Sequence, residues 1–330
     1  MKNKEKMKIL IIKLVAIGDV VHTMIIPKAI KLKHPDWEIH YMTASFIAPM
    51  IENSEYIDKI IPFNNDAGKS KKYLFDTIKS IRKEKYDIIF SLSRTLRLYL
   101  LSYLGGAKKV GVRKYFNKSW VEEYFYSAKE LIKDIELPES LTLSSDPQKV
   151  EEIKNWMREY PKPHIILNAG AYYSGNRTGR TWNIEKWKEL SEKLLQTYGG
   201  TIFVNGSSIE RSEHLKLENE RVHILSGNYS IEDSSIILSL ADLVISGDSG
   251  PLHIASAFGV KTLAILGSTS PDKIKPYGAN GYYIEPVFSC KYCWEKKCKL
   301  QKADEKYPPC IESITVDMVM DKIRECELLK

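Results

Sequence analysis

The stretch from Asp242 to Gly259 carries the clearest signal for chemistry in this sequence. Leu243–Ser246 reads as a short buried strand, Gly247–Gly250 as a tight turn of small residues, and Leu252–Phe258 as a helix. A strand, a glycine turn and a helix in this order direct backbone N–H groups and the positive end of the helix toward one point. This arrangement suits a phosphate group.

Two readings of the turn stay open on these residues alone. In one, the backbone N–H groups of the turn Gly247–Gly250 and the positive start of the helix receive a phosphate. In the other, Asp248 and Ser249 are ordinary helix caps. Because a carboxylate repels a phosphate, we expect Asp248 to cap the helix or to contact a sugar hydroxyl.

Asp19 follows the first apolar run of the chain, at the expected start of a helix. A carboxylate there can take the proton of a sugar hydroxyl as that hydroxyl attacks, and His22, one turn further on, can orient the same substrate. Local sequence fits a helix cap for Asp19 and a structural histidine for His22 equally well. The segment has a single glycine, so the Gly-x-Gly-x-x-Gly pattern of dinucleotide-binding proteins is absent.

Two further polar loops follow predicted strands. The loop from Asn168 to Trp182 holds Arg177 and Arg180, either of which can grip a diphosphate with its two-pronged guanidinium group. In the next loop, Glu210 can accept hydrogen bonds from ribose hydroxyls, or it can simply favour the start of a helix. No Asp-x-Asp occurs in the chain, so we expect arginine and a helix end, rather than a bound cation, to hold the diphosphate.

Four of the five cysteines cluster near the C-terminus, at Cys290, Cys293, Cys298 and Cys310. This spacing can hold zinc or an iron–sulfur cluster, or it can be a loop of reduced thiols. We favour the metal-free reading, because the loop is rich in solvated lysines, and we expect no cofactor. A disulfide framework is not expected, because no signal peptide is evident.

The length, charge and hydropathy of the chain indicate its domain number and its possible partners. The 330 residues predict two domains, and no run of 18 apolar residues predicts a membrane span. Residues 1–150 hold 26 Lys and Arg against 18 Asp and Glu, whereas residues 151–330 hold 23 against 24. The positive excess therefore lies in the first half, as a solvated lysine-rich surface or as a surface for an anionic partner or membrane.

Apolar runs alternate with helix-like segments through both halves, which is typical of α/β domains with parallel sheets. We expect an N-terminal α/β domain over residues 1–160 and a C-terminal α/β domain over residues 161–315. A terminal helix over residues 316–330 is expected to pack back toward the first domain. The boundary is placed at Pro161–Pro163, where two prolines break the chain. In such sheets, ligands lie beyond the carboxyl ends of the strands.

Taken together, these segments resemble the heptosyltransferases of glycosyltransferase family 9, which build the inner core of lipopolysaccharide. Met7–Thr23 resembles their opening motif, Arg180-Thr-Trp182 resembles their Lys/Arg-x-Trp segment, and Gly247–His253 resembles their Asp-Ser/Thr-Gly-x-x-His motif. The resemblance runs from Met7 to beyond Cys310, in the right order. At Leu92-Ser-Arg94 the chain departs from the family, many members of which carry Asp-x-Gln.

The resemblance implies a GT-B fold, with two Rossmann-like α/β domains facing each other across a central cleft. It also implies an inverting transfer from a nucleotide-activated heptose, for which we expect the C-terminal domain to bind ADP-heptose and the N-terminal domain to bind an anionic glycolipid acceptor. Because no Asp-x-Asp occurs in the chain, we expect this transfer to be metal-independent. By position, Asp19 is the expected catalytic base, and Arg180 grips the donor phosphates. The rest of the expected donor site is Glu210, Asp248, Ser249, Gly250 and His253, and the candidate acceptor-binding residues are His22, Arg94, Arg97 and Arg113.

We expect the protein to be cytoplasmic, in peripheral contact with the inner membrane, and to bind no nucleic acid. Two alternatives remain at this point. One is a nucleotide-sugar 2-epimerase, which needs no acceptor, and the other is a non-catalytic module that binds sugar nucleotides.

Overall fold

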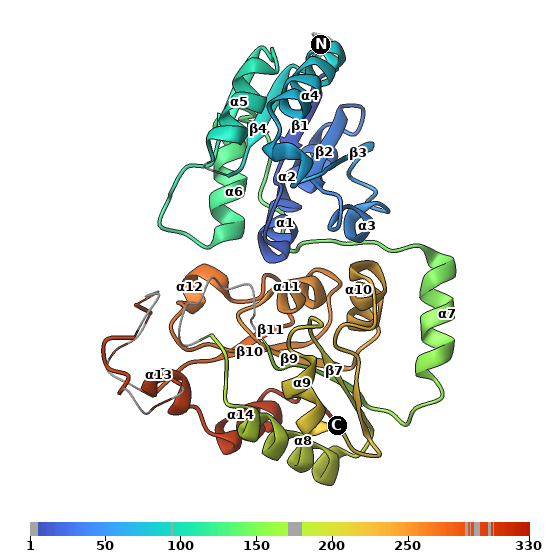
Figure 1. Cartoon of the computed structure of the whole chain (residues 1–330), viewed down its shortest axis with the longest axis vertical. Helices are drawn as coiled ribbons and strands as arrows, with labels where there is room; N and C mark the ends of the chain where they lie inside the picture. Colours follow the sequence, from blue (N-terminus) through green and yellow to red (C-terminus); the bar gives the residue numbers. More distant parts are fainter. Residues whose placement is uncertain are drawn as a thin grey trace. The chain divides into compact units, whose positions relative to one another are not determined.

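The computed structural model describes residues 6–93, 95–170, 180–287, 290, 292–293, 298–302, 305 and 307–330. The chain forms two compact units, Met1–Ser145 and Asp146–Lys330 (Figure 1). The division falls 15 residues before the boundary expected from the two prolines.

The N-terminal unit is built on a five-stranded parallel sheet in the order β3-β2-β1-β4-β5. Its strands are β1 (Lys8–Ile12), β2 (Glu38–Ala44), β3 (Lys59–Phe63), β4 (Ile88–Ser91) and β5 (Lys109–Val112). Its helices are α1 (Ile17–Thr23), α2 (Ile25–Lys33), α3 (Ala48–Ile51), η1 (Ala67–Lys69), α4 (Lys71–Glu84), α5 (Leu96–Leu104) and α6 (Trp120–Lys129). The central strand β1 is an apolar run buried along Ile9–Ile12, as expected for a strand covered on both faces.

The helical segment that follows β1 is interrupted at Met24, where α1 ends and α2 begins. Pro27 explains the interruption, because proline has no N–H to donate to the carbonyl four residues earlier. The break gives Asp19 and His22 a short helix of their own, directly after β1.

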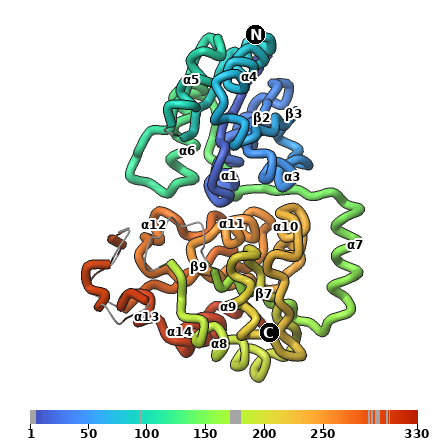
Figure 2. The backbone as a smooth tube through the Cα atoms, in the orientation of Figure 1, coloured from blue at the N-terminus to red at the C-terminus, as the bar shows by residue number. Residues whose placement is uncertain are grey.

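The C-terminal unit is built on a six-stranded parallel sheet in the order β11-β10-β9-β6-β7-β8. Its strands are β6 (His164–Asn168), β7 (Thr201–Asn205), β8 (Val222–Ile224), β9 (Leu243–Gly247), β10 (Thr262–Ile265) and β11 (Gly281–Ile284). Its helices are α7 (Pro147–Met157), α8 (Ile184–Tyr198), α9 (Arg211–His214), η2 (Leu215–Leu217), α10 (Ile231–Ser239), α11 (Gly250–Ala257), α12 (Pro271–Ile274), α13 (Pro309–Glu312) and α14 (Val316–Glu325). The tube in Figure 2 follows this alternation of strand and helix along the chain.

Two helices explain where the C-terminal unit begins and ends. At its start, α7 contacts α10, and Lys149 pairs with Glu232 across that contact. This helix lies before the two prolines but belongs to the second unit. At its end, α14 packs on α8 and buries Val319 and Ile323 in the core of the second unit. Within the described residues, no helix is long and apolar enough to span a membrane.

Candidate functional site

In each sheet, one pair of neighbouring strands marks the point where the order of the strands reverses. In the N-terminal unit this point lies between β1 and β4, and in the C-terminal unit between β6 and β9. Ligands of parallel α/β sheets bind in the crevice that opens there, at the carboxyl ends of the strands. Asp19 follows β1, and Asp248 and Ser249 follow β9, so the predicted residues come directly after strands that flank these two points.

Asp19 is held by a buried lysine rather than by a helix terminus. Lys13 Nζ donates to Asp19 Oδ2 at 2.6 Å, with the lysine side chain 5% and the aspartate side chain 21% exposed. The helix-cap alternative is wrong, because α1 begins at Ile17 after Ala16, and no side chain caps it. Ala16 has φ of 66°, a conformation that costs a non-glycine residue about 1 kcal/mol or more.

Asp19 also lies among aromatic rings and a buried arginine. Lys13 Nζ lies 5.7 Å from the centroid of the Tyr124 ring, and burial, together with the nearby Asp19 carboxylate, raises the pKa of Tyr124 well above its usual value. Arg113 donates to the hydroxyl of Tyr124 at 3.0 Å and to Glu123 at 2.9 Å. Burial opposes the charge of Arg113, but Tyr124, Glu123 and Asp19 outweigh it and raise the pKa of Arg113.

Of the other two candidate acceptor-binding residues that the structure describes, one lies in this cluster with Asp19 and one does not. His22 is buried and lies edge-on to Trp120, with ring centroids 6.0 Å apart. The guanidinium of Arg113 lies 5.8 Å from the centroid of that same ring, so His22 and Arg113 both lie close to Trp120. Arg97, at the start of α5, donates to the carbonyl of Asn65, and Arg94 lies outside the described residues.

A chain of hydrogen bonds joins three strand ends of the second sheet. Asn205 Nδ2 donates to Asn168 Oδ1 at 3.3 Å, and Asn168 Nδ2 donates to Ser249 Oγ at 3.0 Å. Ser249 Oγ also lies 2.8 Å from Ser246 Oγ. This network fixes the turn before α11, where no side chain caps the helix. The start of α11 therefore keeps its N–H groups available for an anion.

Arg180 and Asp248 form a buried ion pair beside this turn. Arg180 Nη2 lies 2.9 Å from Asp248 Oδ2 and also donates to the carbonyl of Asp248. Asp248 is therefore engaged with Arg180 rather than acting as a helix cap. His253 Nε2 lies 3.9 Å from the other carboxylate oxygen, Oδ1. The structure thus brings Arg180, Asp248, Ser249, Gly250 and His253 together.

The position of Arg180 depends on packing around it. Trp182 is buried in the core, donates its indole N–H to the carbonyl of Ile314 at 3.0 Å, and lies edge-on to Trp187. Gly247 permits a close approach on the other side, because a Cβ at this residue would lie 2.6 Å from the carbonyl oxygen of Arg180. Arg177 lies outside the described residues.

Glu210 lies at a third strand end, in the turn after β7. Its carboxylate accepts from both the N–H and the hydroxyl of Ser207 at 2.8 Å. A Cβ on Gly170, after β6, would lie 1.8 Å from Glu210 Oε1, so Glu210 is packed against the loop that leads to Arg180. This contact places Glu210 near the end of β6, whose last residue, Asn168, bonds Ser249.

The four clustered cysteines line one small cavity together with Ser268, Leu300, Pro308 and Pro309. Burial, followed by the neighbouring thiols, raises the pKa of Cys290, and burial raises the pKa of Cys310 to about 11. Among the described residues, no group of three or more His, Cys, Asp and Glu side chains is placed to hold a metal ion. The prediction of a metal-free cluster stays a prediction, which metal analysis of reduced protein would test.

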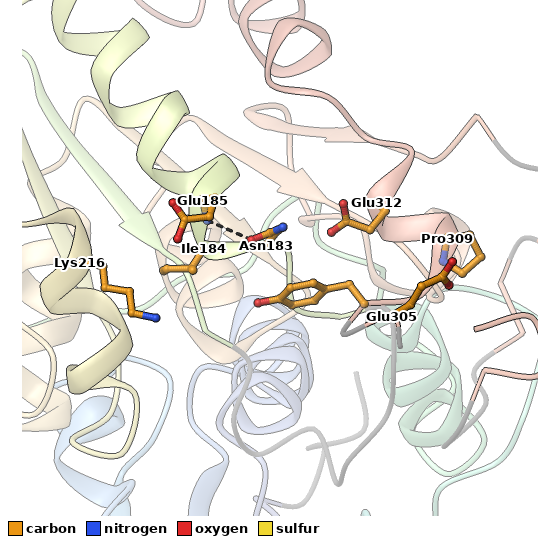
Figure 3. A pocket seen from close by; sticks show the side chains of 8 residues that line it. Asn183, Ile184, Glu185, Lys216, Glu305, Pro309 and Glu312 are labelled. Carbon is orange, nitrogen blue, oxygen red and sulfur yellow. Dashed lines mark hydrogen bonds between the residues drawn. The ribbon is translucent and has the colours of Figure 1, made fainter. Parts of the chain in front are cut away.

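A larger hollow in the C-terminal unit, of about 580 Å³, lies at the start of α8 and contains none of the predicted site residues (Figure 3). It is lined by Asn183, Ile184, Glu185, Lys216, Glu305, Tyr307, Pro309 and Glu312. The side chain of Asn183 caps α8 there by accepting from the N–H of Glu185. The lining carries three carboxylates, which do not suit an anionic nucleotide.

Sequence reasoning missed Lys13, Tyr124 and Asn168 as parts of these clusters. Lys13 and Asn168 had a usable signal, because each is a polar residue at the carboxyl end of an apolar strand. Tyr124 had none, because it belongs to α6, more than a hundred residues after Asp19.

Comparison with known proteins finds one family model and several relatives that match most of this chain. The sequence model of glycosyltransferase family 9 (heptosyltransferase) matches residues 74–304. Lipooligosaccharide heptosyltransferase 2 of Campylobacter jejuni is 24% identical over 87% of this chain and 90% of its own length. Lipopolysaccharide heptosyltransferase 1 of Pseudomonas aeruginosa is 21% identical over 91% of this chain and 89% of its own.

Two solved structures share the fold. The Escherichia coli ADP-heptose lps heptosyltransferase II has a TM-score of 0.76 at 19% identity, covering 97% of this chain and 98% of its own. The glycosyl transferase family 9 structure from Veillonella parvula has a TM-score of 0.82 at 17% identity, covering 98% and 97%. The prediction of a GT-B type fold with two Rossmann-like α/β domains is confirmed.

Proposed function

The chain belongs to glycosyltransferase family 9, the heptosyltransferases, and from this premise we propose that it transfers a heptose from ADP-heptose to the inner-core oligosaccharide of lipopolysaccharide or a related glycolipid. The observation that carries the proposal is the family match over residues 74–304, together with relatives named as heptosyltransferases that align over nearly their full length. The polar clusters at the strand ends of both units support it.

Asp19 is the proposed catalytic base. An acceptor hydroxyl bound next to its carboxylate loses its proton to Asp19 while its oxygen attacks the anomeric carbon of the heptose. The contact with Lys13 uses one oxygen of the carboxylate, and a carboxylate has several further lone-pair positions for an incoming proton. The attack comes from the face opposite the diphosphate, so a single displacement inverts the anomeric carbon.

Arg180 and the start of α11 are the proposed binding groups for the diphosphate. As the bond to the sugar breaks, negative charge grows on the leaving ADP, and a fixed guanidinium and helix N–H groups stabilise that charge. Because Asp248 already holds Arg180 in place, little reorganisation is needed when the donor binds. We propose that no metal ion takes part, because the sequence has no Asp-x-Asp pair.

The basic N-terminal unit is proposed to receive the acceptor. Residues 1–150 carry 26 Lys and Arg against 18 Asp and Glu, and this positive excess suits an anionic sugar or a phosphorylated glycolipid. An acceptor of this kind is anchored in a bilayer, and we propose that the protein acts at the cytoplasmic face of the inner membrane.

The test is a transfer assay with purified protein. A panel of nucleotide sugars is first compared by thermal shift, and ADP-heptose is expected to stabilise the protein most. Incubation with ADP-heptose and a delipidated inner-core acceptor should then release ADP and add one heptose to the acceptor, as measured by mass spectrometry. Conversion of the nucleotide sugar without any acceptor would contradict the proposal and favour an epimerase. Donor binding without turnover would favour a non-catalytic module.

A further inference from the structure

Helix α5 exposes an apolar face where a surface helix normally carries polar residues. Leu96, Leu100 and Tyr103 recur at helical spacing and are 76%, 40% and 60% exposed, and Leu104 beside them is also exposed. The opposite side of the helix, with Leu98 and Leu101, is buried against the sheet. Arg97 is the one charged residue of the helix.

Helix α4 continues this surface and adds positive charge. Phe75 on α4 is 67% exposed, and Lys71, Lys72 and Lys79 are exposed around it. Lys72, Phe75 and Lys79 share one side of the helix, because they are spaced by three and four residues. Long lysine side chains can lie along an apolar layer while their ammonium groups reach the polar headgroups.

The two helices pack against each other, and we call their exposed sides together the α4–α5 face. The exposed apolar members of this face are Phe75, Leu96, Leu100, Tyr103 and Leu104. Arg82 of α4 donates to the carbonyl of Leu104 at 2.7 Å, and a Cβ at Gly105 would lie 2.8 Å from Ile81. The helices are in contact and lie side by side in Figure 1.

The positive charge of the chain is concentrated in the same segment. Residues 71–109 contain ten Lys and Arg against three Asp and Glu. This excess of seven equals the net charge of the entire chain, +7, and accounts for nearly all of the excess in its first half. A solvated surface requires no such overlap of exposed apolar and cationic groups, whereas an anionic bilayer attracts both.

We propose that the α4–α5 face docks the protein on a lipid bilayer that contains anionic headgroups. The location of α5 fits such a role. It follows β4, the neighbour of β1, so its first turn lies at the same edge of the sheet as Asp19. Docking through this face would hold the carboxyl edge of the N-terminal unit close to a membrane-anchored acceptor. This biological reason rests on the proposed function, whereas the binding itself does not.

The experiment measures binding of the full chain to vesicles by co-sedimentation. Vesicles of phosphatidylcholine alone are compared with vesicles that also contain phosphatidylglycerol. The apolar variant carries Leu96→Ser, Leu100→Ser and Tyr103→Ser. A matched control carries Leu32→Ser, Phe46→Ser and Leu215→Ser, three exposed apolar residues outside the face. A charge variant carries Lys71→Gln, Lys72→Gln and Lys79→Gln.

The wild type and the matched control should bind the anionic vesicles and bind phosphatidylcholine weakly. The apolar and charge variants should each lose at least about tenfold in affinity for the anionic vesicles. High salt should weaken the binding of the wild type, and this test does not depend on whether the variants fold. The proposal would be overturned if the wild type does not bind anionic vesicles, or if the apolar variant binds them as tightly as the matched control does. Self-association that the apolar variant abolishes, with no vesicle binding, would instead assign the face to a second copy of the chain.

Activity separates this inference from the proposed function. The apolar variant should transfer heptose to the delipidated acceptor at the wild-type rate, because that acceptor needs no membrane. Vesicle binding without any transferase activity would refute the proposed function and leave the docking surface standing. Transferase activity without vesicle binding would refute the docking surface alone.

Discussion

Arg180→Ala tests whether the buried ion pair with Asp248 serves donor binding as well as stability. In the wild type, Arg180 Nη2 lies 2.9 Å from Asp248 Oδ2, with Asp248 almost fully buried. Removing one partner of a buried pair leaves a charge without compensation, which typically costs 3–5 kcal/mol. Because Arg180 is partly exposed, we expect the lower end of this range, a loss of about 3 kcal/mol in the free energy of unfolding.

The double variant Arg180→Ala with Asp248→Asn separates the two roles. With both charges removed, the structural cost should fall to about 1 kcal/mol, because replacing both partners of a buried pair is often close to neutral. Donor binding should not recover, because the cation that we propose to hold the diphosphate is still missing. A charge-assisted hydrogen bond contributes about 2 kcal/mol, so the affinity for ADP should fall roughly 30-fold in both variants.

Urea denaturation and isothermal titration with ADP measure these two quantities on the same samples. Arg180→Lys should bind ADP with intermediate affinity, since an ammonium replaces a two-pronged guanidinium. Wild-type affinity for ADP in Arg180→Ala, or recovery of affinity in the double variant, would refute the role of Arg180 in donor binding. An unchanged urea midpoint in Arg180→Ala would refute the ion pair as a stabilising contact.

Four further predictions concern other parts of the molecule. Lys13→Met should lower kcat roughly 10- to 100-fold with little change in KM, because the carboxylate of Asp19 loses its fixed position. Lys13→Arg should restore part of the rate. An unchanged kcat in Lys13→Met would show that Lys13 has only a structural role. Heptose transfer should continue at an unchanged rate in EDTA, and abolition by the chelator with rescue by magnesium would contradict the metal-independent mechanism. Hydrogen bonds from two lysines lower the pKa of Glu84 to about 2. The stability that Glu84 contributes is therefore present above the ordinary pKa of 4.5 and is lost as the pH falls toward 2. Glu84→Gln should be less stable than wild type at pH 7, and a difference in the free energy of unfolding between the two proteins that stays constant down to pH 3 would contradict this. Burial raises the pKa of Cys310 to about 11, so iodoacetamide should alkylate it much more slowly than the exposed Cys293, and equal rates measured by mass spectrometry would contradict its burial.

The sequence was sufficient to predict most of the sheets. Apolar runs such as Ile9–Ile12 and His164–Asn168 lie in central parallel strands, where both faces are buried, so composition alone marks them. The boundary between the units was less accessible. Helix α7 lies before the two prolines, yet it packs on α10. The local sequence around α7 gives no sign of a contact with a helix that lies more than seventy residues away.

The site shows the same division between local and distant signals. Asp19, Asp248 and Ser249 were predicted because each follows a strand and matches a motif. Their partners were not predictable from local pattern. The ion pair of Asp248 with Arg180 joins residues 68 positions apart. It also removes one of the two roles expected of Asp248, because α11 has no side-chain cap and this carboxylate is paired with a guanidinium instead.

The single-turnover rate of heptose transfer by Asp19→Asn tests the central claim most directly. Protein saturated with ADP-heptose is mixed with a delipidated inner-core acceptor, and product is measured over time beside the wild type and Asp36→Asn, an exposed aspartate of the same unit. Removing a general base typically costs 10²–10⁴-fold, so Asp19→Asn should be at least about 100-fold slower, while its affinity for ADP and that of the control stay at the wild-type value. Transfer by Asp19→Asn at close to the wild-type rate would contradict the assignment of Asp19 as the catalytic base.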